Sequence, residues 1–226
     1  MTYHNPVLLD ESIKGLNINP NGIYVDATFG GGGHSKEIMK SLQEGCLFAF
    51  DQDDDAIKNT IVDNKFKLIK ANFRYIKNFL KIEGVSKIDG LIADLGISSY
   101  QIDVPERGFA YRYDSVMDMR MNTHSSLDAR EVINSYSESD LAKVFYEYGE
   151  IKQSRRIAKT IIEHREKKNI HTTSEFINIL EGLYPQRMRN KFLSRIFQAI
   201  RIEVNDEINA LKDLLEDVAG LLNNKG

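Results

Sequence analysis

The stretch IYVDATFGGGGHS, Ile23–Ser35, decides the fold of this chain. It opens as an apolar strand, passes through Asp26 and runs into four consecutive glycines, Gly30 to Gly33. A strand that enters a glycine turn and then a helix presents backbone N–H groups and the positive end of the helix dipole to a ligand. Glycine is required because a Cβ would block both positive φ angles and the close approach of that ligand. The stretch therefore predicts a nucleotide-cofactor loop.

The same residues narrow the choice of cofactor. Gly30 and Gly32 fit the first two positions of a G-x-G-x-x-G dinucleotide fingerprint, but its third glycine would fall on Ser35. Asp26 would repel a pyrophosphate, whereas its carboxylate suits a cofactor with a cationic amino-acid end, such as S-adenosylmethionine. A glycine turn without a ligand is the alternative that this stretch leaves open.

Composition limits the class of protein and the number of domains to be expected. The 226 residues are 42% hydrophobic and 28% charged, as expected for a globular protein of one large domain or one domain with an insert. We see neither an apolar run of membrane-spanning length nor a secretory signal, and we expect a cytoplasmic protein with no membrane partner. The single cysteine, Cys46, excludes an internal disulfide, and the sequence suggests no metal site.

Apolar runs alternate with amphipathic stretches over the first 94 residues, which predicts a parallel sheet with helices on both faces. The expected strands are 23–28, 46–50, 66–69 and 88–93, and the expected helices are 35–42, 53–62 and one that ends near residue 82. Ligands of such sheets bind beyond the carboxyl ends of the strands. The candidate site residues are therefore those that end or follow the strands, namely Asp26, Asp51, Asn72, Phe73 and Asp94.

Two of these residues suggest specific contacts with a nucleotide. Asp51 lies about 20 residues beyond the glycine turn, where an acidic residue accepts the hydroxyls of a ribose. The alternative is that Asp51 belongs to a solvated acidic run that ends at Asp55. Phe73 is a candidate for packing on the adenine ring, or is an ordinary core aromatic.

The second half of the chain has a different pattern. Residues 95–121 show no regular period, and long irregular segments are usually functional or disordered. From Ser125 the sequence is helical, with capping-box patterns at Ser137 and Thr172. We expect helices at 138–148, 151–167 and 174–183, followed by a periodic run, 192–222, that forms one long helix or two.

Charge is unevenly distributed in these helices, although the formal net charge of the chain is only −3. Residues 151–170 carry seven Lys and Arg against two Glu, and residues 185–201 carry five Lys and Arg with no acid. Solvated helix faces would explain the pattern, and contact with RNA phosphates is the functional alternative.

Six motifs occur in a specific order along nearly the whole chain. They are HNPVLLDE (4–11), DATFGGGGHS (26–35), FDQD (50–53), DGLIADLGISSYQID (89–103), ERGFAY with MDMRM (106–121) and FQAIRIEVNDE (197–207). The series resembles the ribosomal RNA small-subunit methyltransferase H (MraW) family. The resemblance implies an α/β fold with a class I methyltransferase (Rossmann-like) core, 1–104 and 203–226, and an inserted loop and helical domain for RNA recognition, 105–202.

The resemblance also implies an activity, the S-adenosylmethionine-dependent methylation of the N4 amine of a cytidine in small-subunit ribosomal RNA, with that RNA or the small ribosomal subunit as partner. Because Asp94 lies at the end of the fourth expected strand, we expect it to be the catalytic residue that orients or polarises the target amine. The cofactor-binding residues that the resemblance implies are Gly32, Gly33 and His34 at the methionine end, Asp51 at the ribose, Phe73 near the adenine, and Asp94 and Gln101 in the shared cofactor and target pocket.

Two departures from the family pattern stand out. Many members read HPATR where this chain has KFLSR, residues 191–195. Members also continue into further core strands, so we expect either a truncated product or a sheet edge that another chain covers, for example in a homodimer.

Two other functions remain open. One is a non-catalytic RNA-binding or ribosome-assembly factor with a retained cofactor site. The other is an NAD-dependent oxidoreductase, against which Asp26 and the missing third glycine argue.

Overall fold

The computed structural model describes residues 6–224 and 226, so His4 of the first motif lies outside the described residues. The chain divides into two compact units, residues 1–98 with 208–226, and residues 99–207. The sequence analysis placed these boundaries at 104/105 and 202/203. RNA recognition by the helical unit stays a prediction.

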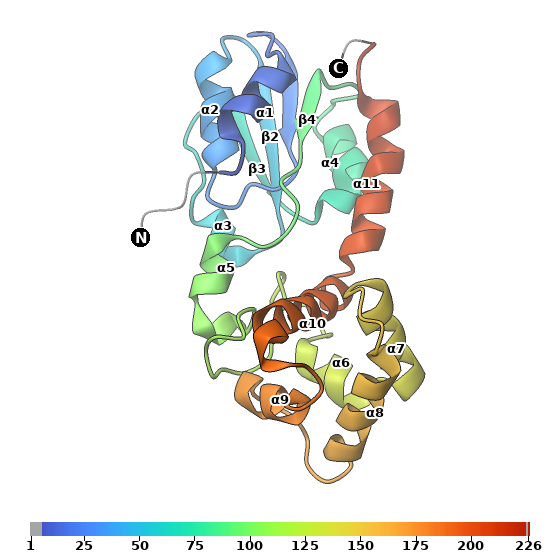
Figure 1. Cartoon of the computed structure of the whole chain (residues 1–226). Coiled ribbons are helices and arrows are strands. Elements are labelled where there is room, and N and C mark those ends of the chain that lie inside the picture. Colours follow the sequence, from blue (N-terminus) through green and yellow to red (C-terminus); the bar gives the residue numbers. More distant parts are fainter. Residues whose placement is uncertain (1–5, 225) are drawn as a thin grey trace. The chain divides into compact units, whose positions relative to one another are not determined.

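The first unit is built on a parallel four-stranded sheet in the order β3-β2-β1-β4 (Figure 1). All four strands were predicted, and the Rossmann-like α/β fold class is confirmed. Because β1 lies between β2 and β4, the carboxyl ends of β1 and β4 form the switch point of the sheet, where ligands of such folds bind. The strands are β1 (Ile23–Asp26), β2 (Cys46–Asp51), β3 (Phe66–Lys70) and β4 (Gly90–Ile92).

Helices cover both faces of this sheet (Figure 1). Alternate strand residues point to opposite faces, so the sheet is buried on both sides. Tyr24 and Leu47 belong to the cluster under α1 (Leu9–Leu16) and α2 (Gly33–Ser41). Val25, Phe48 and Phe50 belong to the cluster under α4 (Ile76–Ile82) and α11 (Glu207–Leu221).

The helix expected at 53–62 was wrong in length, because α3 covers only Asp54–Ile57. Asp53 starts it by accepting a hydrogen bond from the Asp55 N–H at 3.0 Å. Beyond Ile57, Ile61 is only partly buried and the Val62 side chain is 98% exposed. A short helix without a buried face is not stable, so the chain leaves the helix and turns toward β3.

The second unit is helical apart from its connecting segments, the longest of which, residues 108–128, we call the irregular segment (Figure 1). Its long central helix α10 packs against α6 and α7. The final periodic run is two helices, because the chain breaks at Asn205 and Asp206, where Asp206 has a φ of 49°. The elements are α5 (Ser99–Asp103), η2 (Pro105–Arg107), α6 (Ala129–Ser135), α7 (Glu138–Glu147), α8 (Ser154–Arg165), α9 (Thr173–Leu180), η3 (Gln186–Met188) and α10 (Arg189–Val204).

The two predicted capping boxes differ. Thr172 and Glu175 form a complete box, in which each side chain bonds the backbone of the other residue. Ser137 accepts the Asp140 N–H, but the Asp140 carboxylate bonds the Ser137 hydroxyl instead of its backbone. Aspartate is one methylene shorter than the glutamate of a complete box, and only the N-cap half of this prediction is confirmed.

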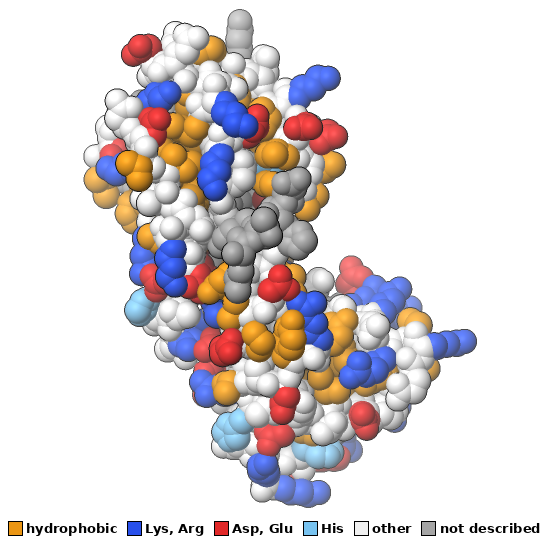
Figure 2. Space-filling model, turned by 90° about the vertical axis from the view of Figure 1, so that its left-hand side faces the viewer, with side chains coloured by type: hydrophobic (Ala, Val, Ile, Leu, Met, Phe, Trp, Pro, Cys, Tyr) orange, Lys and Arg blue, Asp and Glu red, His pale blue; other side chains and the backbone are white. Residues whose placement is uncertain are grey.

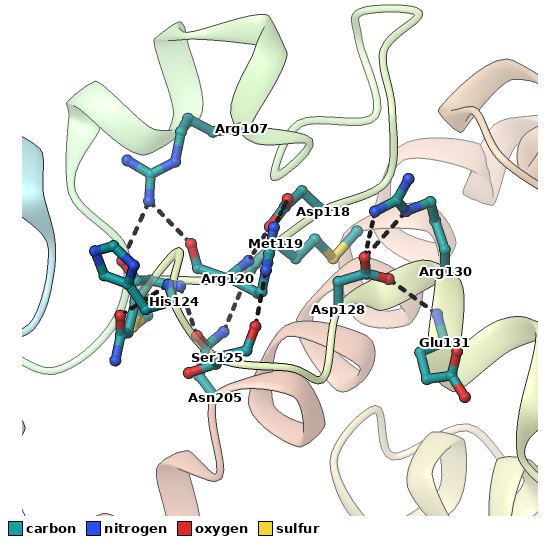
Figure 3. Close-up of polar contacts among 12 residues, drawn as sticks. Arg107, Asp118, Met119, Arg120, His124, Ser125, Asp128, Arg130, Glu131 and Asn205 are labelled. Carbon is teal, nitrogen blue, oxygen red and sulfur yellow. Dashed lines mark hydrogen bonds and ion pairs between the residues drawn. The ribbon is translucent and has the colours of Figure 1, made fainter.

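The irregular segment is fixed by side chains that bond its backbone (Figure 3). Met119 has a φ of 60°, which is unfavourable for a residue with a side chain. Asn205 holds it there, since its Nδ2 donates to the Met119 carbonyl at 2.8 Å and its Oδ1 accepts the Met121 N–H at 2.7 Å. Arg107 donates to the Arg120 carbonyl at 2.9 Å. Met117 and Met119 are fully buried, so the Met-rich stretch serves packing, as predicted.

The described residues contain neither a helix of membrane-spanning character nor a cluster of metal-binding side chains. No helix in this part of the chain is long and apolar enough to cross a membrane. Within the same residues, no three His, Cys, Asp or Glu side chains form a group that could hold a metal ion.

Candidate active site

The glycine loop is fastened at both ends by Asp26, the last residue of β1. This carboxylate is 1% exposed, and its Oδ1 accepts the Thr28 N–H at 3.1 Å while its Oδ2 accepts the Ser35 hydroxyl at 2.7 Å. Burial raises the pKa of Asp26, although both hydrogen bonds lower it. The two bonds lie on either side of the glycines, so Asp26 fixes where the loop begins and ends.

Asp51 reaches the same loop from the end of β2. Its Oδ2 accepts the Gly30 N–H at 2.8 Å, and its Oδ1 accepts the Asp53 N–H at 2.8 Å. Burial raises the pKa of Asp51 to about 6, outweighing these hydrogen bonds, and the charges of Asp53 and Asp26 act in the same direction as burial. The residue predicted to hold the ribose therefore also sets the position of Gly30.

Asn59 holds Gly30 from its other side. Its Nδ2 donates to the Gly30 carbonyl at 3.1 Å. Gly30 has a φ of +52°, and a Cβ placed on it would meet no atom within 4 Å, so the space in front of it is open. Asn59 was not predicted as a site residue because it lies within the helix expected at 53–62.

Gly32, Gly33 and His34 form the turn into α2. Gly32 has a φ of +74°, and a Cβ there would lie 2.9 Å from the Phe29 ring. A Cβ on Gly33 would collide with the Pro6 ring. The His34 side chain is 5% exposed, and its Nε2 makes no hydrogen bond among the described residues. A buried polar atom without a partner, beside a glycine cradle, fits a site that binds a polar ligand.

Asp94 follows β4 and is exposed. Its backbone N–H donates to the Thr28 hydroxyl oxygen at 2.7 Å, which joins the segment after β4 to the segment after β1. Gly96, two residues further on, has a φ of +137° and open space where a Cβ would lie. The carboxylate of Asp94 therefore lies beside the switch point of the sheet, on a segment that leaves room for a ligand.

The remaining predicted residues have different surroundings. Phe73 is half-buried at the start of η1 (Phe73–Tyr75) and packs on the core cluster below α4, so its contact with an adenine stays a prediction. The Asn72 side chain is used internally, because it donates to Gln52 at 3.0 Å and accepts the Arg74 N–H at 3.0 Å. Gln101 is buried on α5 in the second unit, and its part in the cofactor pocket stays a prediction.

The first unit thus gathers the glycine loop and three carboxylates, Asp26, Asp51 and Asp94, at the carboxyl ends of β1, β2 and β4. These carboxylates could be predicted because each one ends or follows a predicted strand. Thr28 and Ser35 lie within the glycine motif, but no role was predicted for them. Short hydroxyl side chains that flank a glycine turn are the signal that would have identified both.

The chain matches the model of the MraW methylase family over residues 1–226. The chain belongs to this family. The resemblance inferred from the six sequence motifs is therefore confirmed.

Curated relatives of this MraW methylase chain carry the name "Ribosomal RNA small subunit methyltransferase H". The relative from Flavobacterium johnsoniae is 52% identical over 223 residues, which are 98% of this chain and 74% of that protein. The relative from Cytophaga hutchinsonii is 52% identical over 226 residues, covering 99% and 76%. The relative from Karelsulcia muelleri is 50% identical and covers 97% and 73%.

Proposed function

We propose that this chain is an S-adenosylmethionine-dependent methyltransferase that methylates the N4 amine of a cytidine in small-subunit ribosomal RNA. Family membership and the name of the relatives support the reaction class and the RNA substrate. The observation that carries the proposal is the gathering of the glycine loop, Asp51 and Asp94 at the carboxyl ends of β1, β2 and β4.

The residues of the first unit suit this cofactor. Gly32, Gly33 and the unpaired His34 nitrogen would hold its methionine end, and Asp51 would accept the ribose hydroxyls. Phe73 would pack near the adenine. The family resemblance also assigns Gln101, a residue of the second unit, to the cofactor and target pocket. When bound, S-adenosylmethionine supplies a methyl group activated by a sulfonium.

Asp94 is the proposed catalytic residue. The N4 amine of cytosine is a weak nucleophile because its lone pair is delocalised into the ring. A carboxylate that accepts a hydrogen bond from one N–H of the amine favours the pyramidal form of the nitrogen. In that form the nitrogen lone pair can form the new N–C bond. The same carboxylate can accept the proton that the nitrogen then loses. Since the methyl donor is already activated, positioning supplies much of the acceleration.

The target base must leave its stack to reach such a pocket, so the substrate is a single-stranded or flipped cytidine. Contact with the surrounding RNA would come from the helical unit. Exposed or partly exposed cations lie at the starts of two of its helices, and none of them is ion-paired within the described part of the chain. We call them the basic surface: Lys152, Arg155 and Arg156 of α8 and its preceding turn, and Arg187, Arg189 and Lys191 of η3 and α10.

The two parts of the basic surface are linked by contacts between α10 and the turn before α8. Arg195 pairs with Glu150 at 3.3 Å, and Gln198 donates to the Tyr148 carbonyl at 3.3 Å. Lys191 lies about one helical turn before Arg195. On the face drawn in Figure 2, basic side chains are interspersed with acidic ones. The basic surface is therefore a better candidate for contact with RNA phosphates than the net charge of the chain.

The test is transfer of a labelled methyl group from S-adenosylmethionine to unmethylated small ribosomal subunits, with a parallel cofactor titration. We expect transfer, and we expect binding of S-adenosylmethionine but not of NAD. Salt-sensitive RNA binding without transfer would favour the assembly-factor alternative, and NAD binding would favour the oxidoreductase. The cytoplasm is the proposed location, and the homodimer stays a prediction.

A further inference from the structure

Where β1 and β4 separate, the hydrogen bonds between them change from backbone–backbone to backbone–side-chain bonds. Asp26 pairs with Ile92, and the Ala27 N–H donates to the Ile92 carbonyl at 2.8 Å. In a regular parallel ladder the next bond would run from the Asp94 N–H to the Ala27 carbonyl. The Asp94 N–H donates instead to the Thr28 hydroxyl oxygen at 2.7 Å. A side chain has therefore replaced the backbone acceptor.

Phe29, the residue after Thr28, bonds to the strand on the other side of β1. The Phe29 N–H donates to the Phe50 carbonyl of β2 at 2.9 Å, so the chain after β1 leaves β4 and follows β2. This divergence opens the switch point of the sheet. The Thr28 hydroxyl bridges the gap that opens, and it does so at the residue whose carboxylate we assign to catalysis.

We propose that Thr28 is a positioning residue for Asp94. Its hydroxyl fixes the backbone of Asp94 and thereby aims the carboxylate at the target amine. This inference rests on the proposed function, in which the Asp94 carboxylate accepts a hydrogen bond from the N4 amine of the cytidine.

Asp94 needs such a restraint because its surroundings supply little packing. The Asp94 and Leu95 side chains are exposed, and Gly96 has open space where a Cβ would lie. A misplacement of about 1 Å in a reacting group costs about a hundredfold in rate. A hydrogen bond at the backbone of Asp94 is the contact that limits its movement while leaving the carboxylate available to substrate.

The first arm of the test removes the acceptor without changing the shape. Thr28→Val keeps the branched side chain and loses the hydroxyl, whereas Thr28→Ser keeps the hydroxyl. We expect Thr28→Val to lower kcat by about tenfold or more, with the KM for S-adenosylmethionine within about threefold of wild type. Thr28→Ser should restore most of kcat. Thr60→Val, at an exposed threonine outside the site, is the matched control and should change neither constant.

The second arm separates a positioning role from a general structural one. In an Asp94→Asn background, Thr28→Val should cause little further loss, because both changes act on the same carboxylate. Additive losses in this cycle, or equal activities of Thr28→Val and Thr28→Ser, would overturn the proposal.

A third readout does not depend on activity. Amide hydrogen exchange at Asp94 should be slow in wild type and Thr28→Ser and at least tenfold faster in Thr28→Val. Unchanged exchange would overturn the positioning role even if the methyltransferase is active. If wild type transfers no methyl group while Thr28→Val accelerates exchange at Asp94, the proposed reaction fails and the backbone restraint stands.

Discussion

The Asp51 carboxylate accepts the Gly30 N–H at 2.8 Å, so the side chain assigned to the ribose also restrains the glycine loop. Gly30 is held on its other side by Asn59, at 3.1 Å. These hydrogen bonds therefore hold the end of β2 and the loop after β1 together. A change in the charge of Asp51 should alter both the contact with the ribose and the shape of the loop.

We predict that cofactor binding depends on pH through Asp51. Burial raises the pKa of this carboxyl to about 6 in the free protein. Ribose hydroxyls donate to the ionised form, so binding must displace a proton below that pKa. The Kd for S-adenosylmethionine should be nearly constant above pH 7 and should rise toward tenfold per unit as the pH falls below about 6. Isothermal titration between pH 5 and 8 measures this.

Substitution assigns the effect to Asp51. Asp51→Asn cannot titrate, so it should bind about tenfold more weakly at pH 7.5 and show a flatter pH profile. Asp217→Asn removes a surface carboxylate that pairs with Lys77 at 3.6 Å, and it should keep the wild-type profile. An unchanged profile in Asp51→Asn would assign the titration to another group, such as Asp26.

Asn205 should be important for the order of the irregular segment. Asn205→Ala removes the hydrogen bonds that Asn205 makes with the Met119 carbonyl and the Met121 N–H. Each lost hydrogen bond costs about 0.5–1.5 kcal/mol, so the second unit should be less stable by about 1–3 kcal/mol. Hydrogen exchange by mass spectrometry should show faster exchange at Met121, together with a lower thermal midpoint. Asn178→Ala, at an exposed position of α9, should change neither, and equal effects of the two variants would contradict this role.

The basic surface should determine how strongly RNA binding depends on salt. Arg155→Glu with Arg156→Glu should weaken binding to small-subunit RNA by about tenfold or more. The slope of log K against log salt should fall by roughly one for each phosphate that the variant no longer neutralises. Binding of S-adenosylmethionine, which we assign chiefly to residues of the first unit, should not change.

Lys14→Glu with Lys81→Glu is the control for the basic surface, since it makes the same charge change at exposed positions of the first unit. Fluorescence anisotropy at several salt concentrations gives the comparison. Equal losses in both double variants would indicate an effect of net charge and would count against a specific surface.

Much of the first unit could be predicted because its signals are local. Short apolar runs between amphipathic stretches gave all four strands, and the residues that follow strands gave Asp26, Asp51 and Asp94. Helix length is less local, since α3 ends at Ile57 and the Val62 side chain, inside the expected helix, is exposed. That depends on the neighbouring elements and has no signature in the sequence.

The contacts that complete the site could not be predicted. Thr28 and Asp94 are 66 residues apart in the chain, and Gly30 and Asn59 are 29 apart. Hydrogen bonds from side chains to distant backbone groups follow no periodicity, so they emerge only when the strands are in register. The break at Asn205 is similar, because its two backbone partners lie in a segment more than 80 residues away.

The identity of the methylated nucleoside tests the proposed function most directly. Small ribosomal subunits are incubated with the chain and S-adenosylmethionine, the RNA is digested, and the nucleosides are separated and weighed by mass spectrometry. Our account predicts N4-methylcytidine with wild type and at least a hundredfold less with Asp94→Ala. A methyl group on a ring carbon or on another base, or full activity of Asp94→Ala, would contradict it.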